Sequence, residues 1–246
     1  MSGPAVAGLV LGQLKVADHS NEITALPALL RALELAGCVV TVDAMGCQKE
    51  VAKEIHEADA DYVLALKGNQ GTLHAEVKEF LDDAQTRGFA GVAHQFIETI
   101  EKDHGRIETR RYWITEQIGW LADKDQWEAL RSVGTVEAVR EVNGQVSTER
   151  RYYLSSLPAE AERFAAAVRG HWEIENCLHW VLDVQMGEDR CAVRNKNAAQ
   201  NLAAYKPGAW TKTVFIFAGI LIVVFGFYRP EYFSAIIESA VKVIIG

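Results

Sequence analysis

Short apolar runs alternate with amphipathic segments between residues 8 and 88, and this alternation constrains the fold more than any other feature. Residues 39–43 and 61–66 are nearly continuous runs of apolar, often β-branched residues, which is typical of strands buried on both faces. Each is followed by a segment with the apolar spacing of a helix. A strand–helix–strand–helix order favours parallel pairing. The sequence therefore predicts an α/β fold, with further elements expected as a strand at 8–16 and helices at 23–37, 49–60 and 72–88.

A β-rich insertion, about residues 92–157, interrupts this pattern. Residues 96–116 read as two strands joined by a short turn. Residues 135–156 read as a hairpin, because Asn143-Gly144 between alternating residues is a strong signal for a two-residue turn. A helix is expected at 159–186. We therefore expect residues 8–205 to form one core that contains the insertion.

The composition changes again after Tyr205. Residues 214–228 carry no charge, and Trp210 and Tyr228 flank them as aromatic residues do at membrane interfaces. As a helix, this run of about 15 residues would be roughly 23 Å long, against about 30 Å for the core of a bilayer. We expect a hydrophobic helical tail at 206–246. Two alternatives stay open for it: a membrane segment that contacts the bilayer through residues 213–228, or a buried core helix.

Charge and cysteine usage limit the class of protein. The net charge of −8 argues against non-specific nucleic-acid binding by the chain as a whole. The four cysteines show no Cys-X-X-Cys spacing, which is typical of reduced thiols in a cytosolic protein. The first residues lack the basic stretch of a secretory signal peptide. We therefore expect a cytoplasmic protein.

Two acidic residues lie where a strand or a helix would present them to a ligand. Asp43 ends the first buried strand, at the edge where α/β sheets bind ligands, although Asp at such a place also serves in turns and helix caps. Glu175 lies in the helix at 159–186, one turn from both His171 and His179. This helix face could hold Mg²⁺ through the carboxylate, hold zinc through the imidazoles, or be a solvated polar surface.

Basic residues gather locally in spite of the acidic total. Lys67 closes the second buried strand, where it would contact a phosphate or belong to a plain turn built on Gly68 and Asn69. Arginines also follow the turn of the first hairpin and the late helix, where they would position a phosphate backbone or form a solvated face. The candidate DNA-binding residues are Lys67, Arg106, Arg110, Arg111, Arg169, His171, Arg190 and Arg194.

Read together, these segments resemble the H-repeat-associated, DDE-type transposases of bacterial insertion sequences. The resemblance rests on SNEITALPALL, VVTVDAMGCQKEVA, DYVLALKGNQGTL, HGRIETR and RGHWEIENCLHWVLDV in this order, and it covers about residues 8–204. It implies an RNase H-like catalytic core with a β-strand insertion before the last acidic residue. It further implies DNA as partner, a Mg²⁺ or Mn²⁺ cofactor, and a nucleoid-associated homodimer that acts on paired transposon ends.

The same resemblance assigns catalytic and metal-binding roles to Asp43 and Glu175, which match the second Asp and the Glu of the family's three carboxylates. One turn before Glu175 the chain has His171, in the HWxIE form of the H-repeat branch, where the wider superfamily has Arg. Leu182 stands where that superfamily has Lys. The Asp-Gly-Lys string that carries the family's first Asp is not found here, and Asp18 is not assigned its role.

The sequence thus predicts a DDE transposase fragment, truncated at both ends. We expect little or no transposition activity from it, because loss of one of three carboxylates weakens metal binding. The alternatives are a non-catalytic DNA-binding remnant and an enzyme with a helix-borne metal site at His171, Glu175 and His179. Because the first strand of an RNase H-like sheet is central, its loss would expose a sheet edge, and we expect poor solubility.

Overall fold

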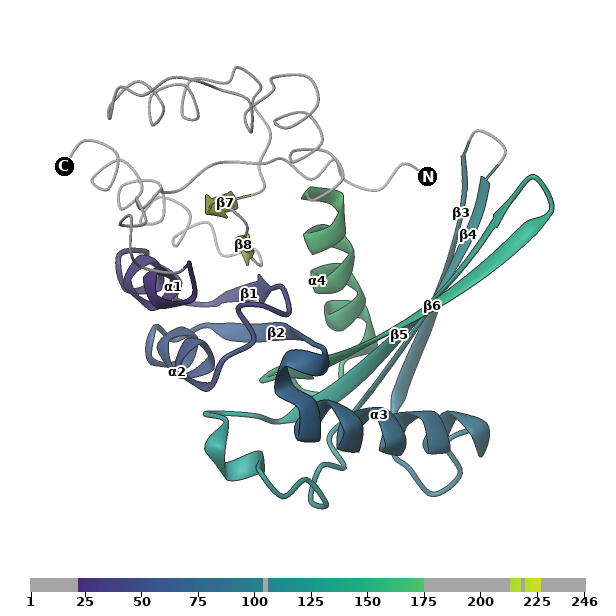
Figure 1. The fold of residues 1–246 in the computed structure, drawn as a ribbon, viewed down its shortest axis with the longest axis horizontal. Coiled ribbons are helices and arrows are strands. Elements are labelled where there is room, and N and C mark those ends of the chain that lie inside the picture. The colour runs from purple at the N-terminus through teal and green to yellow at the C-terminus, as the bar shows by residue number, and fades with distance from the viewer. Residues whose placement is uncertain (1–21, 104–105, 175–212, 218–219, 227–246) are drawn as a thin grey trace.

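A computed structural model of the protein describes residues 22–103, 106–174, 213–217 and 220–226 (Figure 1). The strands in these ranges form one eight-stranded sheet in the order β3-β4-β5-β6-β2-β1-β8-β7. Helices pack against the sheet, so the expected α/β class is confirmed. The strand expected at 8–16 lies outside the described residues.

The centre of the sheet is a parallel pair, as the sequence predicts. It consists of β1 (Cys38–Val42) and β2 (Asp61–Leu66). All residues of β1 are buried, which explains its uninterrupted apolar sequence. The crossover between the two strands runs through α2 (Lys49–Glu57), which buries Val51, Ala52 and Ile55. The helix α1 (Glu22–Arg31) packs beside α2.

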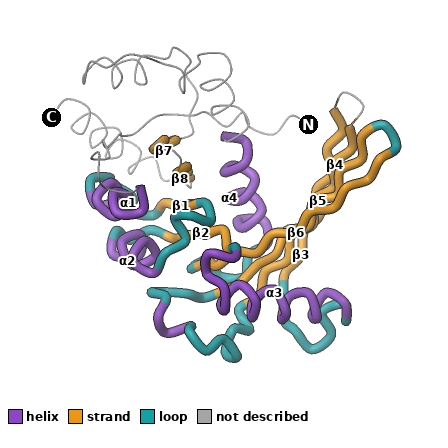
Figure 2. The backbone as a smooth tube through the Cα atoms, in the orientation of Figure 1, coloured by secondary structure: helices purple, strands orange, loops and turns teal. Residues whose placement is uncertain are grey.

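The β-rich insertion forms a long antiparallel arm that extends away from this centre (Figures 1 and 2). This β-arm consists of β3 (Gln95–Asp103), β4 (Arg106–Thr115), β5 (Ser132–Val142) and β6 (Gln145–Ser155). The carboxyl end of β6 pairs with β2, so the arm continues the central sheet. Asn143 and Gly144 have φ angles of 51° and 78°, as a type I′ turn requires. Both predicted hairpins are therefore confirmed.

Two helices lie on opposite faces of the β-arm, α3 (Gly71–Thr86) on one and α4 (Ala161–Ile174) on the other. Because successive strand residues point to opposite faces, each strand presents one set of side chains to each helix. Phe164 of α4 is fully buried, and its ring meets Tyr112 and Tyr153 edge-on. Two short 3₁₀ helices are also described, η1 (Gly68–Gln70) and η2 (Lys124–Gln126).

The expected helical tail is wrong for the residues of it that the structure describes. These form two strands, β7 (Thr213–Phe217) and β8 (Ile220–Gly226). The strand β8 pairs antiparallel with β1, so β1 has no exposed edge in the described part of the chain. The physical reason is that Val, Ile and Phe fit a pleated sheet, and the edge of β1 offers unpaired backbone groups. No helix among the described residues is long and apolar enough to cross a membrane.

Candidate functional site

Asp43 follows the last residue of β1 and lines a cavity of about 510 Å³, as the sequence predicts for a residue at the carboxyl edge of a sheet. The turn after it is held by the backbone N–H of Gly46, which donates to Asp43 Oδ1 at 3.0 Å. A Cβ at Gly46 would lie 2.2 Å from Val42 Cγ1, so a residue with a side chain does not fit there. The local sequence DAMG therefore fixes the direction of the carboxylate.

The surroundings of Asp43 act on its charge in two directions. Burial raises the pKa of its carboxyl above the usual range, and the N–H groups of Gly46 and Met45 and the ammonium of Lys67 oppose this rise. Lys67 follows β2, next to β1 in the sheet, and lines the same cavity. A positive group thus lies beside a partly buried carboxylate, which suits the binding of a phosphate together with a cation.

The imidazole of His171, on α4, also lines this cavity and is 8% exposed. Its Nδ1 lies 3.0 Å from Oγ1 of Thr41, which is buried on β1 two residues before Asp43. Residues two apart on a strand share a face, so His171 packs against the face of β1 that leads to Asp43. The sequence placed His171 among the candidate DNA-binding residues. The structure shows in addition that its side chain is hydrogen-bonded to Thr41, which links α4 to β1.

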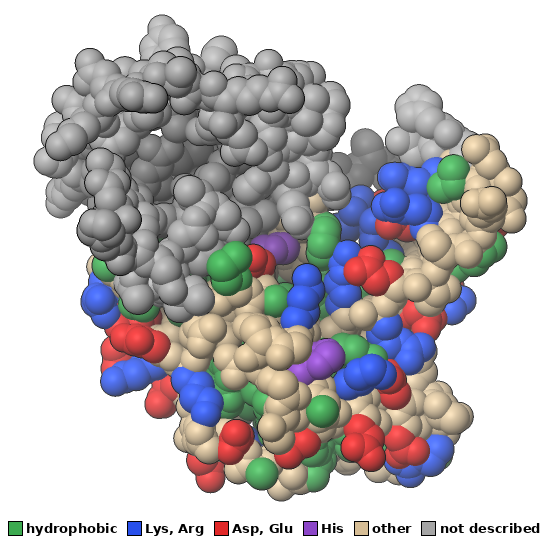
Figure 3. All heavy atoms as spheres, in the orientation of Figure 1, with side chains coloured by type: hydrophobic (Ala, Val, Ile, Leu, Met, Phe, Trp, Pro, Cys, Tyr) green, Lys and Arg blue, Asp and Glu red, His purple; other side chains and the backbone are tan. Residues whose placement is uncertain are grey.

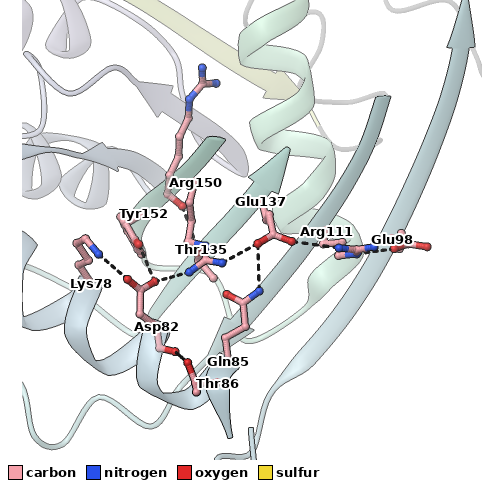
Figure 4. A network of polar contacts seen from close by, with 11 residues as sticks. Lys78, Asp82, Gln85, Thr86, Glu98, Arg111, Thr135, Glu137, Arg150 and Tyr152 are labelled. Atoms are coloured by element: carbon pink, nitrogen blue, oxygen red, sulfur yellow. Dashed lines mark hydrogen bonds and ion pairs between the residues drawn. The ribbon is translucent and has the colours of Figure 1, made fainter. Parts of the chain in front are cut away.

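Two other carboxylates that line the cavity are held by cations. Asp82 of α3 accepts from Lys78 at 2.5 Å, from the Tyr152 hydroxyl at 2.7 Å and from Arg150 at 2.8 Å (Figure 4). Glu149 accepts from Nε and Nη2 of Arg151 at 2.7 and 2.8 Å. Among the described residues, Asp43 makes no ion pair of this kind with a lysine or arginine. It is therefore the cavity's available carboxylate.

A divalent cation would find one of its expected ligands in the described part of the cavity. The carboxylate of Asp43 is the oxygen donor that Mg²⁺ and Mn²⁺ prefer. Glu175, the second expected ligand, follows the described end of α4 at Ile174 and lies outside the described residues, as do His179, Arg190 and Arg194. Within the described ranges, no three His, Cys, Asp or Glu side chains come together as a metal site.

The alternation of strand residues divides the predicted DNA-binding arginines between the two faces of the β-arm. Arg110 and Arg111 are consecutive on β4 and therefore point to opposite faces. Arg111 lies on the α3 face, where its guanidinium binds Glu98 at 2.7 Å and Glu137 at 3.1 Å. Arg110 lies on the α4 face with Arg169 of α4, and both bind Glu101. Arg106, at the start of β4, shares the face of Arg110.

Some side chains around Asp43 were not predicted. His74 and Lys78 of α3 and Trp172 of α4 line its cavity, and Trp172 stacks on the guanidinium of Arg151 at 3.6 Å. Basic and histidine side chains accordingly gather where the β-arm meets the central strands (Figure 3). The helical period of a sequence does not show which strand a helix face meets, so these neighbours of Asp43 could not be found from it.

Comparison with known proteins gives a family match over most of the chain. Residues 5–210 match the family described as transposase DDE domain. A protein named "Putative transposase YncI" from Escherichia coli O157:H7 is 41% identical over 203 residues, which is 81% of this chain and 51% of the relative. The "H repeat-associated putative transposase YhhI" of Escherichia coli K12 is 40% identical over 197 residues, covering 78% of this chain and 51% of the relative.

A third relative has no activity in its name. The "Uncharacterized protein in dhlA 3'region" of Xanthobacter autotrophicus is 49% identical over 152 residues, which is 62% of this chain and 50% of the relative. The chain thus spans about half the length of these curated relatives. No solved structure matches it.

Proposed function

Because the chain belongs to the family of transposase DDE domains, we propose that its Asp43 cavity is a site of metal-dependent phosphoryl transfer on the DNA ends of an insertion sequence. The observation that carries this proposal is the placement of Asp43. Its carboxylate follows β1, lines the cavity beside Lys67, and forms no ion pair with a described arginine or lysine side chain. The core is proposed to be RNase H-like, which the parallel β1–β2 pair supports.

In the proposed phosphoryl transfer, the residues of this chain bind the metal ion and orient the DNA. A bound Mg²⁺ or Mn²⁺ ion would supply activation of the attacking oxygen and stabilisation of the leaving oxygen in an in-line displacement. Asp43 supplies a ligand to such an ion, and Glu175 is proposed as the second. Lys67 attracts the phosphate oxygens on which negative charge develops. The hydrogen bond between Thr41 and His171 links β1 to α4.

We propose that this chain by itself has low transposition activity. Arg150 and Lys78 bind Asp82, and Arg151 binds Glu149, so neither carboxylate is available to serve as a third metal ligand.

A non-catalytic DNA-binding role is the second candidate function, and the arginines on the α4 face favour it. Action as a homodimer on paired ends and a nucleoid-associated location in the cytoplasm belong to the same proposal. The zinc alternative would use Nε2 of His171, because its Nδ1 contacts Thr41.

The test is nicking of supercoiled plasmid by the purified chain in Mg²⁺ or Mn²⁺, with DNA binding measured on the same samples. We expect Asp43→Asn to remove any metal-dependent nicking and to leave DNA binding in place. Asp83→Asn is the matched control, because Asp83 is an exposed acid that pairs with Arg87 on α3. Nicking that survives Asp43→Asn would overturn the proposed site. DNA binding by the wild-type chain without nicking would favour the second candidate function.

A further inference from the structure

A second, smaller hollow of about 120 Å³ lies between α4 and the β-arm. Four arginines line it, and we call it the arginine hollow: Arg110, Arg140, Arg151 and Arg169. It shares five lining residues with the Asp43 cavity: Glu149, Arg151, Tyr153, Val168 and Trp172. The stacked pair of Arg151 and Trp172 therefore forms a common wall between the two spaces.

A buried carboxylate explains why arginines from different strands meet here. Glu108 of β4 is 5% exposed and lies opposite Arg140 of β5 in the sheet register. Nη2 of Arg110 forms an ion pair with its Oε1 at 2.6 Å, and guanidinium nitrogens of Arg106 and Arg140 lie at 3.6 and 3.7 Å from its carboxylate oxygens. Three guanidinium groups thus surround one buried carboxylate.

The group carries an excess of positive charge. Its carboxylates are Glu108, Glu101 and Glu149, and five arginines pair with them: Arg106, Arg110, Arg140, Arg151 and Arg169. Among these described side chains the positive charges therefore outnumber the negative ones, although the whole chain carries −8. An excess of this kind, partly exposed, attracts anions.

Of the four arginines that line the hollow, Arg140 is the one whose guanidinium makes no hydrogen bond to a described residue. Its side chain is 51% exposed. By contrast, Arg111 and Arg150 on the α3 face are held by carboxylates at 2.6 to 3.1 Å. The two faces of the arm thus differ in their capacity to bind an added anion, and the α4 face is the one that retains it.

We propose that the arginine hollow binds a backbone phosphate of the DNA strand that enters the Asp43 cavity. Guanidinium groups match the geometry of phosphate oxygens, and Arg140 and Arg169 present theirs from opposite walls. The shared wall of Arg151 and Trp172 lets one strand have a phosphate in each space. This inference rests on the proposed function for its substrate, and it adds a phosphate subsite and the direction of the strand along the α4 face.

The test measures affinity for a labelled DNA duplex as a function of salt, using the full chain and the variants Arg140→Ala and Arg169→Ala. Each lost phosphate contact is expected to lower the slope of log affinity against log salt by about one unit, which is a roughly eightfold loss of affinity at about 0.1 M salt. Arg131→Ala is the control, because Arg131 is exposed, pairs with Glu116 and lines neither space. Arg140→Lys is expected to recover part of the loss. Thermal unfolding of each variant shows whether it is folded.

The outcomes separate this inference from the proposed function. Loss of affinity and slope in Arg140→Ala and Arg169→Ala, with Arg131→Ala unchanged, supports the subsite. Equal loss in all three variants would mean that overall charge alone attracts DNA, and it would overturn the subsite. Unchanged affinity in all variants of a chain that still nicks DNA through Asp43 would overturn the subsite and leave the proposed function standing. A folded wild-type chain that binds no DNA would overturn both.

Discussion

The hydrogen bond between Thr41 and His171 joins the strand that leads to Asp43 with the helix that leads to Glu175 in the sequence. Both side chains are buried, so the bond is shielded from water. A buried polar contact of this kind fixes the register of two elements, because any other alignment leaves polar groups without that partner. At the residue scale, the site therefore depends on Thr41, whose side chain contacts neither metal nor DNA in the proposed mechanism.

We predict that Thr41→Val lowers the free energy of unfolding by about 1–3 kcal/mol, since it removes a buried hydrogen bond and keeps the shape of the side chain. Denaturant unfolding measures this change. Thr148→Val is the control, because Thr148 is exposed on a strand and its replacement is expected to change stability by less than about 0.5 kcal/mol. Equal effects of the two substitutions would contradict a special role for the contact with His171.

At the scale of elements, α3 is attached to the β-arm by carboxylates that bind several donors at once (Figure 4). Burial acts to raise the pKa of Asp82, but hydrogen bonds from Lys78, Tyr152 and Arg150 outweigh it and lower that pKa. A folded-state pKa below the unfolded value contributes stability above about pH 4, and this stability is lost as pH falls through the folded pKa. The attachment of α3 is therefore sensitive to acid.

Asp82→Asn tests this attachment. We expect the variant to be about 1–3 kcal/mol less stable than the wild type at pH 7, because three donors lose a charged acceptor. The difference should shrink as the pH falls below about 4, where the wild-type carboxylate takes up a proton. Unfolding measured from pH 7 to pH 2 gives both quantities. Asp83→Asn, at an exposed neighbour on the same helix, should show neither effect.

The attachment of α4 is apolar instead. Phe164→Ala is expected to cost about 3–5 kcal/mol, because it leaves a cavity between α4 and the rings of Tyr112 and Tyr153. The comparison variant is Phe96→Ala on β3, where the ring is 48% exposed and less than half as large a cost is expected. Denaturant unfolding of both variants checks the order. A smaller cost for Phe164 than for Phe96 would contradict the packing described here.

At the scale of the whole molecule, the sequence predicted the helices and strands of the core better than it predicted which of them contact one another. The parallel pair, both hairpins and the position of Asp43 follow from buried runs and turn residues that act locally. The sequence could not show which arginines would lie on the α3 face of the β-arm and which on the α4 face, because this depends on how the helices pack against β4. The segment after Tyr205 was predicted to be helical because its length and lack of charge suit a helix, whereas its described residues form β8, which pairs with β1, and β7, which pairs with β8.

This pairing leads to a prediction about solubility. Val224 of β8 lies opposite Val40 of β1, and proline there would remove a backbone donor between two neighbouring strands. We expect Val224→Pro to expose the edge of β1 and to increase aggregation with concentration, as measured by light scattering. Val214→Pro on β7, at the outer edge of the sheet, is the control and should aggregate less. Equal aggregation of both variants would contradict the cover by β8.

The two-sided β-arm also limits how its length can change over evolution. Deleting a single residue of β4 before Arg110 would turn every later side chain to the opposite face, so that Arg110 and Arg111 would exchange faces. Insertions and deletions should therefore be tolerated here when they add or remove two residues on each of two paired strands. Related chains are expected to differ in the reach of this arm by even steps, with the same side of the ribbon kept for arginine.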